Sequence, residues 1–424
     1  MKVLLLNTYD SNGGAAIATV RLAQALSESG IEVELGVKRK NTTNNFVFQV
    51  PQKKINLILR YTRLIRKIIQ KINQKLLHLS LFKSTNPIYH SQNKESFIDI
   101  QFINSSDFDL VHLHWINDDM ISIEDIAKIT KPILWTMHDS WVFCGAEHHP
   151  NIWENDFRYK DGYTRLTKPV STNGPDVCRY AWERKKRYLK DKHITFISPS
   201  TFEKKLIGES ALFGDATCYL IPNITPSETF HPQNKKTIRE LLNLPIDKKI
   251  IGFGAAYEIS NTKSNKGGHL LIEALNKITH PEDYLLLIFG PVNNEFLKEI
   301  KTPVFFAGFI ENPNIMASLY NACDVFVCPS VIENLPLTCL ESLFCGIPVA
   351  AFKTGGIPDV VEHKQTGYLA PLFNTEELYK GILYCIDNQE KLSKQSLIKA
   401  CNDFNELEIC KKHIELYLAI IGNS

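Results

Sequence analysis

Short apolar segments that alternate with amphipathic helical segments constrain the fold of this chain more than any other feature. Residues 2–7 are typical of a buried strand, and a loop that ends in Gly13 and Gly14 follows. Apolar residues then recur at helical spacing until Gly30, after which a second apolar segment covers residues 31–37. A strand, a helix and a second strand in this order are the repeating unit of a parallel sheet. The sequence therefore predicts an α/β fold.

The same alternation occurs twice along the chain, and a segment with several prolines separates the two series. We expect further strands at residues 110–113, 133–137 and 194–198 in the first series, and at 250–254, 284–289, 304–307, 324–328 and 348–352 in the second. Between the two series, the periodic pattern is broken by Pro222, Pro226, Pro232 and Pro245. A length of 424 residues fits two domains of this kind.

We therefore predict two Rossmann-like, doubly wound domains and a C-terminal helix. The first domain covers residues 1–225, the second covers 226–403, and the helix at 404–424 is expected to cross back to the first domain. Open parallel sheets bind ligands at the carboxyl ends of their strands. Two such sheets that face each other place the active site in the cleft between the domains.

Composition excludes several other classes of protein. Hydrophobic residues make up 44% and charged residues 22% of the chain, as in globular proteins rather than disordered or collagen-like ones. The 10 cysteines include no CxxC pair, which argues against a disulfide framework and favours reduced thiols in the cytoplasm. No apolar stretch approaches the ~20 residues of a transmembrane helix, and the first residues lack the apolar core of a signal peptide. We therefore expect a cytoplasmic protein.

Basic residues are concentrated in one part of the chain, although its net charge is only +2. Residues 35–94 contain 13 lysines and arginines and no acidic residue. Within this stretch, residues 53–83 place apolar side chains along one helical face and basic side chains along another, as in helices that lie on anionic lipid. A merely solvated helix is the alternative, and nucleic acid is disfavoured because no stacking aromatic residues accompany the charge. We expect peripheral attachment to the cytoplasmic face of the inner membrane.

Residues 329–350 carry the clearest chemical signal. A strand is expected to end at Pro329, and Pro336 suits the first position of the helix that follows. The first amides of a helix have no partner within it, so this helix start can accept phosphate. Glu333 lies in the loop before the helix and Glu341 lies within it. Carboxylates are strong acceptors for sugar hydroxyl groups, which predicts that both side chains face a phosphorylated sugar ligand.

Glu333 and Glu341 are separated by seven residues, and the turn Gly346-Ile347-Pro348-Val349 follows them. This pattern resembles the signature of the retaining family-4 glycosyltransferases of GT-B fold. The resemblance implies an enzyme of the hexosyltransferase type that moves a sugar from a UDP- or GDP-linked donor to a hydroxyl group, with retention of the anomeric configuration. The implied acceptor is a lipid-linked saccharide or an oligosaccharide, as in the branch of the family that serves bacterial polysaccharide assembly.

The resemblance also implies roles for individual residues. The catalytic residues would be Glu333, which contacts hydroxyl groups of the donor sugar, Lys266, which neutralises the leaving diphosphate, and His138, which touches the donor sugar or the acceptor. The expected donor-binding positions are Gly13, Gly14, Lys263, Gly308, Phe309, Ile310, Asn334, Leu335, Leu337, Thr338 and Glu341. The family often has an arginine beside or upstream of Lys266 that this sequence lacks, and Lys263 is the candidate to replace it. No metal or other cofactor is implied.

Among the donor-binding positions, three groups have different implied tasks. Glu341 would bind the ribose diol, and the amides of residues 334–338 would hold the diphosphate. The main chain of residues 308–310 would recognise the nucleobase, while Gly13 and Gly14 would lie beside the donor phosphate and the acceptor.

Other chemistries are less well supported. A zinc site is suggested by Cys144, Glu147, His148, His149 and Cys178, but neither HExxH nor CxxC accompanies them, so we assign these residues to an acceptor-binding loop. The chain has no complete dinucleotide fingerprint and no P-loop, which disfavours nicotinamide and ATP chemistry. Two alternative functions remain, a non-catalytic membrane-associated subunit of a polysaccharide assembly complex and a sugar-nucleotide epimerase of the same architecture.

Overall fold

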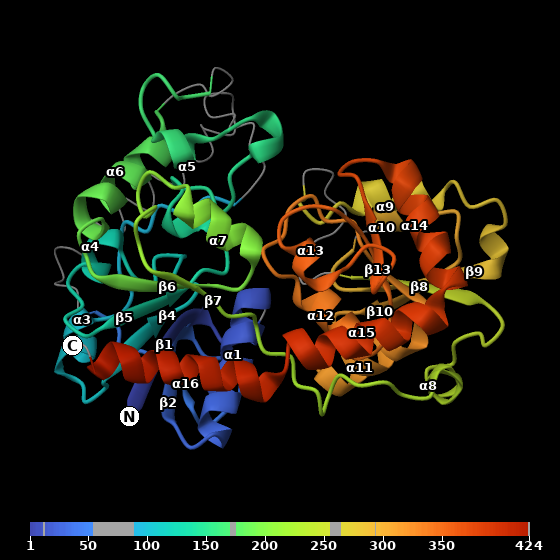
Figure 1. The fold of residues 1–424 in the computed structure, drawn as a ribbon, viewed down its shortest axis with the longest axis horizontal. Helices are drawn as coiled ribbons and strands as arrows, with labels where there is room; N and C mark the ends of the chain where they lie inside the picture. The colour runs from blue at the N-terminus through green and yellow to red at the C-terminus, as the bar shows by residue number, and fades with distance from the viewer. Residues whose placement is uncertain (12, 54–88, 170–174, 255–263, 293, 423–424) are drawn as a thin grey trace.

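The computed structural model of this chain describes residues 1–11, 13–53, 89–169, 175–254, 264–292 and 294–422. Figure 1 shows two α/β domains side by side, with the first half of the chain in one and most of the second half in the other. The basic segment expected at 53–83 lies outside the described residues except for Lys53, and Lys263 lies outside them as well. In the described part of the chain, no helix is long and apolar enough to cross a bilayer.

The first domain is built on a parallel sheet of seven strands. Their order in the sheet is β3-β2-β1-β4-β5-β6-β7. The strands are β1 (Lys2–Tyr9), β2 (Glu32–Arg39), β3 (Val47–Gln49), β4 (Leu110–Leu113), β5 (Ile133–Thr136), β6 (Ile194–Ser198) and β7 (Cys218–Leu220). The chain builds the sheet outward from β1 in one direction and then, from β4 on, in the other. This is the doubly wound arrangement expected from the sequence.

Helices and short turns of helix connect these strands. They are α1 (Gly14–Glu28), α3 (Ile100–Ser105), α4 (Ile123–Ile126), η1 (Ser140–Val142), η2 (Ile152–Glu154), α5 (Arg158–Asp161), α6 (Val177–Leu189) and α7 (Thr201–Gly208). Strand β1 is covered on both faces, because its side chains alternate between two cores. Val3 and Leu5 pack in the core that contains α1, whereas Leu4 and Leu6 pack in the core on the other face. All four are fully buried, which explains the continuous apolar run of this strand.

The second domain repeats the plan with a parallel sheet of six strands. Their order is β10-β9-β8-β11-β12-β13. The strands are β8 (Lys249–Gly254), β9 (Tyr284–Phe289), β10 (Val304–Gly308), β11 (Val325–Cys328), β12 (Val349–Phe352) and β13 (Gly367–Ala370). The helices are α8 (Lys235–Leu241), α9 (Gly268–Leu275), η3 (Pro281–Asp283), α10 (Asn294–Lys298), α11 (Pro313–Ala322), α12 (Leu337–Phe344), α13 (Ile357–Val360), α14 (Thr375–Asp387) and α15 (Gln389–Asp403). Two Rossmann-like domains are thus confirmed.

The last helix, α16 (Glu406–Gly422), lies against the first domain rather than the second. In Figure 1 it runs from the end of α15 across to α1, and the C-terminus lies on the same domain as the N-terminus. Ile409, Cys410, Leu416 and Tyr417 are buried in the core that also holds α1. The hydroxyl group of Tyr417 lies 2.8 Å from Nδ1 of His112 on β4.

The structure corrects the sequence-based description of the sheets at their edges. Strands β3, β7 and β13 were not among the strands expected from the sequence, and each of them lies at the edge of its sheet. Edge strands pair on one side only and are partly open to solvent, so they need no long apolar run. Cys218, Tyr219 and Leu220 of β7, for example, all remain at least partly exposed.

Candidate active site

Lys266 and Glu333 form an ion pair at the carboxyl ends of two adjacent strands. Lys266 follows β8 and precedes α9, Glu333 follows β11, and these two strands pair with each other in the sheet. The Nζ atom of Lys266 lies 2.5 Å from Oε1 of Glu333, and the two side chains are 22% and 15% exposed. An anionic ligand that reached this position would compete with the carboxylate for Lys266 and would release Glu333 to accept hydrogen bonds.

Helix α12 begins directly after this pair. Its first residue is Leu337, and Pro336 is the capping residue in extended conformation, so the expectation that Pro336 opens the helix is wrong by one residue. The amides of Leu337 and Thr338 are therefore among those that a helix leaves without an internal partner. On the opposite side, Gly13 caps α1 with a φ of 98°, a backbone conformation that favours glycine. A Cβ atom on the neighbouring Gly14 would lie 4.0 Å from the side chain of Leu337, so the two helix starts face each other.

Glu341 lies one turn into α12 and is held from both domains. Its Oε1 atom accepts a hydrogen bond from Nη2 of Arg21 at 2.6 Å, and its Oε2 atom accepts one from the hydroxyl group of Tyr320 at 2.9 Å. Arg21 belongs to α1 of the first domain and stacks over Phe230, with 5.0 Å between the guanidinium carbon and the ring centre. Burial, together with the Glu341 charge, raises the pKa of Tyr320. The ion pair between Arg21 and Glu341 thus joins the two domains at a buried position.

Asn334 also connects the two domains. Its Nδ2 atom donates to the carbonyl oxygen of Met137 at 2.8 Å, and its Oδ1 atom accepts from the hydroxyl group of Ser200 at 2.5 Å. Nearby, the carboxylate of Asp359 accepts hydrogen bonds from the amide and the hydroxyl group of Thr201, at 2.6 and 2.5 Å. The side chain of Asn334 is thus used to join the domains, which leaves its main chain for a ligand.

His138 follows β5, and its ring stacks against that of His114. Its Nε2 atom lies 3.0 Å from Nδ1 of His114, and burial lowers the pKa of His138 to about 4. The residue lines two small cavities, one beside α1 and residues 221–224 and the other beside Trp115 and Trp141. At neutral pH the imidazole is therefore uncharged, which suits a hydrogen-bonding role better than that of a cation.

Asp139 directly follows His138 in the chain and contacts His148. Asp139 Oδ2 lies 2.5 Å from Nδ1 of His148 and accepts from Nε1 of Trp115 at 3.0 Å. Burial would raise the pKa of Asp139, but the His148 contact outweighs it and holds the pKa at about 2. Burial lowers the pKa of His149 to about 4, and the charges of Asp139, Glu333 and Lys266 also act on it.

Residues 234–400 match the family model described as glycosyl transferases group 1. This part of the chain is thus similar to the group 1 glycosyltransferases. An uncharacterised glycosyltransferase of Haemophilus influenzae is 26% identical over 188 residues, which cover 41% of this chain and 53% of that protein. Spore coat protein SA of Bacillus subtilis is 27% identical over 216 residues, or 45% of this chain and 55% of that protein. The chain thus spans about half the length of these curated relatives.

Solved structures extend the likeness to the whole fold. The Anabaena protein Alr3699/HepE, solved in complex with UDP and glucose, superimposes with a TM-score of 0.64 at 17% sequence identity, covering 99% of this chain and 100% of that one. At this level of identity the match establishes the architecture alone. The GT-B fold expected from the sequence is confirmed, and the match to the group 1 model lies in its second half.

The predicted catalytic residues Lys266 and Glu333 and the predicted donor-binding residues fall into two places in this GT-B fold. Lys266, Glu333, Glu341, Gly14 and the start of α12 lie around one boundary between the domains. Gly308 instead ends β10, and Phe309 and Ile310 follow it; this strand is separated from β8 by β9. Phe309 is 51% exposed there.

Several residues of the site carried no recognisable signal in the sequence. Arg21 lies within an ordinary amphipathic helix, and Tyr320 lies in α11, yet both hold Glu341. His149 was assigned to an acceptor loop, and the charges of Glu333 and Lys266 also act on its pKa. A sequence motif cannot reveal these neighbours, because each pair is joined only by the folding of distant segments.

Proposed function

We propose that this protein is a glycosyltransferase that moves a sugar from a nucleotide diphosphate sugar to a hydroxyl group of a saccharide or lipid-linked saccharide, with retention at the anomeric carbon. The observation that carries the proposal is the 2.5 Å contact between Lys266 and Glu333, directly before the start of α12 in the part of the chain that matches the group 1 glycosyltransferase model. An anion-binding helix start and a cation, which suit the diphosphate of such a donor, meet there with a carboxylate, which suits the hydroxyl groups of its sugar.

The chemistry follows from the charges of these groups. As the bond between the sugar and the diphosphate breaks, negative charge develops on the phosphate oxygens, and Lys266 and the first amides of α12 stabilise it. Glu333, released from Lys266, accepts hydrogen bonds from hydroxyl groups of the donor sugar. We propose that the departing phosphate takes the proton of the acceptor hydroxyl group on the same face of the sugar, so that no side-chain nucleophile is required.

We propose Glu341 as the ribose ligand. Each of its oxygens accepts one hydrogen bond from the protein, and a carboxylate has capacity for about four in total. Within the described residues, Nη1 of Arg21 is buried and has no hydrogen-bond partner, so it can donate to the same ligand. The uridine nucleotide bound by the Anabaena structure makes UDP the first nucleotide to test.

We also propose that the enzyme works at the cytoplasmic face of the inner membrane, in the assembly of a bacterial cell-surface polysaccharide. Support comes from the basic, amphipathic pattern of residues 53–83 in the sequence. The lipid-linked acceptor that this location implies would then be held close to the cleft.

The first experiment measures thermal stabilisation of the full chain by UDP, GDP, ADP and CMP. A ligand at 100 times its dissociation constant stabilises the protein by about 2.7 kcal/mol. We expect one diphosphate to raise the melting temperature of the wild type, Lys266→Ala to reduce this shift strongly, and Lys298→Ala, an exposed lysine on α10, to leave it unchanged. If no nucleotide stabilises the folded wild type, the protein is an assembly subunit rather than a transferase.

Product analysis separates the remaining alternatives. With the matching donor and no acceptor, a transferase is expected to release free sugar and nucleotide diphosphate slowly. An epimerase would instead return an altered sugar nucleotide. With an acceptor present, proton NMR of the product reports the anomeric configuration, and an inverted product would contradict the retaining mechanism.

A further inference from the structure

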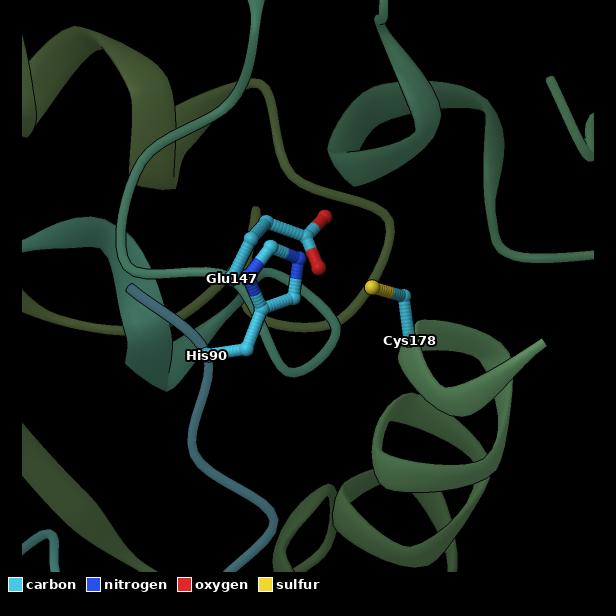
Figure 2. Close-up of side chains that lie close together, drawn as sticks. All are labelled: His90, Glu147 and Cys178. Atoms are coloured by element: carbon cyan, nitrogen blue, oxygen red, sulfur yellow. The ribbon is translucent and has the colours of Figure 1, made fainter. Parts of the chain in front are cut away.

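Three side chains of metal-binding type converge in the first domain. They are His90, Glu147 and Cys178, and one ligand atom from each lies within 4.8 Å of the others. Figure 2 shows the sulfur atom of Cys178 pointing toward the Glu147 carboxylate, with the His90 ring beside that carboxylate. The three residues come from three separate segments of the chain. The sequence analysis considered Glu147 and Cys178 as ligands but did not include His90.

The main chain fixes two of these residues against each other. His90 and Glu147 form an antiparallel bridge. On either side of it, the amide of Ser91 donates to the carbonyl oxygen of Ala146 at 2.7 Å, and the amide of His148 donates to that of Tyr89 at 3.0 Å. This small ladder holds the imidazole and the carboxylate in register without any contribution from their side chains.

The third residue is fixed by a helix. Cys178 is the second residue of α6, and the Asp176 side chain caps this helix by accepting from the amide of Arg179 at 3.0 Å. The chain passes very close to the thiol at Gly145, where a Cβ atom would lie 2.6 Å from Cys178 Cβ and 2.7 Å from Oε2 of Glu147. A glycine is therefore required at this position for the three side chains to meet.

One buried oxygen atom points to a ligand. Glu147 is 1% exposed, and its Oε1 atom accepts a hydrogen bond from the hydroxyl group of Tyr163. Its Oε2 atom is buried, and the thiol of Cys178, a weak donor, lies against this carboxylate. A weak thiol donor compensates a buried carboxylate poorly, and a cation bound between the thiolate and the carboxylate would satisfy both groups.

We propose that His90, Glu147 and Cys178 bind a zinc ion. Thiolate, imidazole and carboxylate are the ligands that zinc prefers, and three protein ligands leave the fourth tetrahedral position to a water molecule. On binding, the thiol proton of Cys178 passes to solvent, so that one thiolate and one carboxylate balance the two charges of the ion. Arg158, whose charge also acts on Glu147, is itself paired with Asp156 at 2.9 Å and Asp176 at 3.6 Å.

The ion would be a structural cross-link beside the cleft. His148 follows Glu147, and its imidazole contacts Asp139 Oδ2 at 2.5 Å and the hydroxyl group of Ser91 at 2.9 Å. Ser91 in turn follows His90. The zinc ion would thus join the two segments that hold His148, and through it would position Asp139 at the end of β5. This inference does not depend on the proposed transfer reaction.

The test measures the metal content and the metal-binding spectrum of the full chain. Purified without chelators, the wild type is expected to hold about one zinc ion per chain by plasma mass spectrometry. Replacing zinc by cobalt should give a thiolate-to-cobalt charge-transfer band. Cys178→Ser should abolish this band, whereas Cys401→Ser, at an exposed cysteine of α15, should leave it unchanged.

Glu147→Gln provides a second variant that preserves side-chain shape. We expect it to weaken zinc binding at least tenfold in competition with a chromophoric chelator, while its melting temperature with and without UDP shows whether it is folded. A folded wild type that holds no zinc and gives no cobalt band would overturn the proposal. Retention of zinc in both Cys178→Ser and Glu147→Gln would overturn it too.

Discussion

At the scale of single residues, the contact between Arg21 and Glu341 is the clearest test of how the domains are joined. The side chains are only 11% and 7% exposed, so loss of the guanidinium group would leave a buried carboxylate with Tyr320 alone. Removing one partner of a buried ion pair is strongly destabilising. We expect Arg21→Met to lower the free energy of unfolding by about 3 kcal/mol, measured by urea unfolding.

An exposed ion pair of the same charge type serves as the control. Lys394 and Glu390 lie 2.8 Å apart on α15, with side chains 69% and 86% exposed. Because solvent screens such pairs, Lys394→Met should cost less than about 1 kcal/mol. If Arg21→Met and Lys394→Met lower the free energy of unfolding by the same small amount, the buried pair between the domains does not contribute as described.

At the scale of an element, the start of α7 combines a helix cap with a domain contact. The hydroxyl oxygen of Ser200 accepts from the amide of Glu203 at 3.1 Å, while the hydroxyl group donates to Asn334. Ser200→Ala should therefore lower the free energy of unfolding by about 1 kcal/mol through loss of the cap. It should also weaken binding of UDP in calorimetry, because Asn334, at the start of the expected diphosphate loop, loses one of its two side-chain partners.

Asn374→Ala separates these two effects. Asn374 caps α14 by accepting from the amide of Glu377 at 3.0 Å, and this bond is exposed. The free energy of unfolding of Asn374→Ala should fall by about as much as that of Ser200→Ala, but its affinity for UDP should equal that of the wild type. Equal UDP affinity in both variants would show that the Ser200–Asn334 contact has no influence on the nucleotide site.

The elements that the sequence predicted well are those whose environment is uniform. Central strands such as β1 and β8 are covered on both faces, so each contains a continuous run of residues without polar side chains, 3–6 in β1 and 250–254 in β8, and the pattern is visible without the structure. The edge strands β3, β7 and β13 lack this pattern, since their neighbours are partly solvent. In the same way, the start of α12 was predicted to within one residue, because a proline in this context restricts where a helix can begin.

At the scale of the whole molecule, buried histidines should make the protein sensitive to acid. Burial lowers the pKa of His138 to about 4 and that of His413, on α16, to about 3, and it lowers the pKa of His112 and His114 as well. Between these values and about 6.5, the unfolded chain binds more protons than the folded one. Stability is therefore full above pH 6.5 and falls as the pH decreases toward 4, by up to about 1.4 kcal/mol per pH unit for each such histidine.

His413→Gln tests this prediction by urea unfolding at several pH values. The variant should show a smaller loss of stability between pH 6.5 and 4, because one proton-binding difference has been removed. His280→Gln is the matched control, since the His280 side chain is 72% exposed. A pH dependence that is identical in wild type and His413→Gln would contradict the role assigned to the buried imidazole.

The sequence by itself determined the α/β architecture with two parallel sheets and the position of the Glu333 and Glu341 motif at a helix start. These features depend on the periodicity and spacing of residues that are close together in the chain, so they can be read from the sequence alone. Only the tertiary structure decided which side chains meet. Arg21 and Glu341 are 320 positions apart, and His90, Glu147 and Cys178 come from separate segments. Such contacts arise from the packing of whole elements, so no local pattern of residues records them.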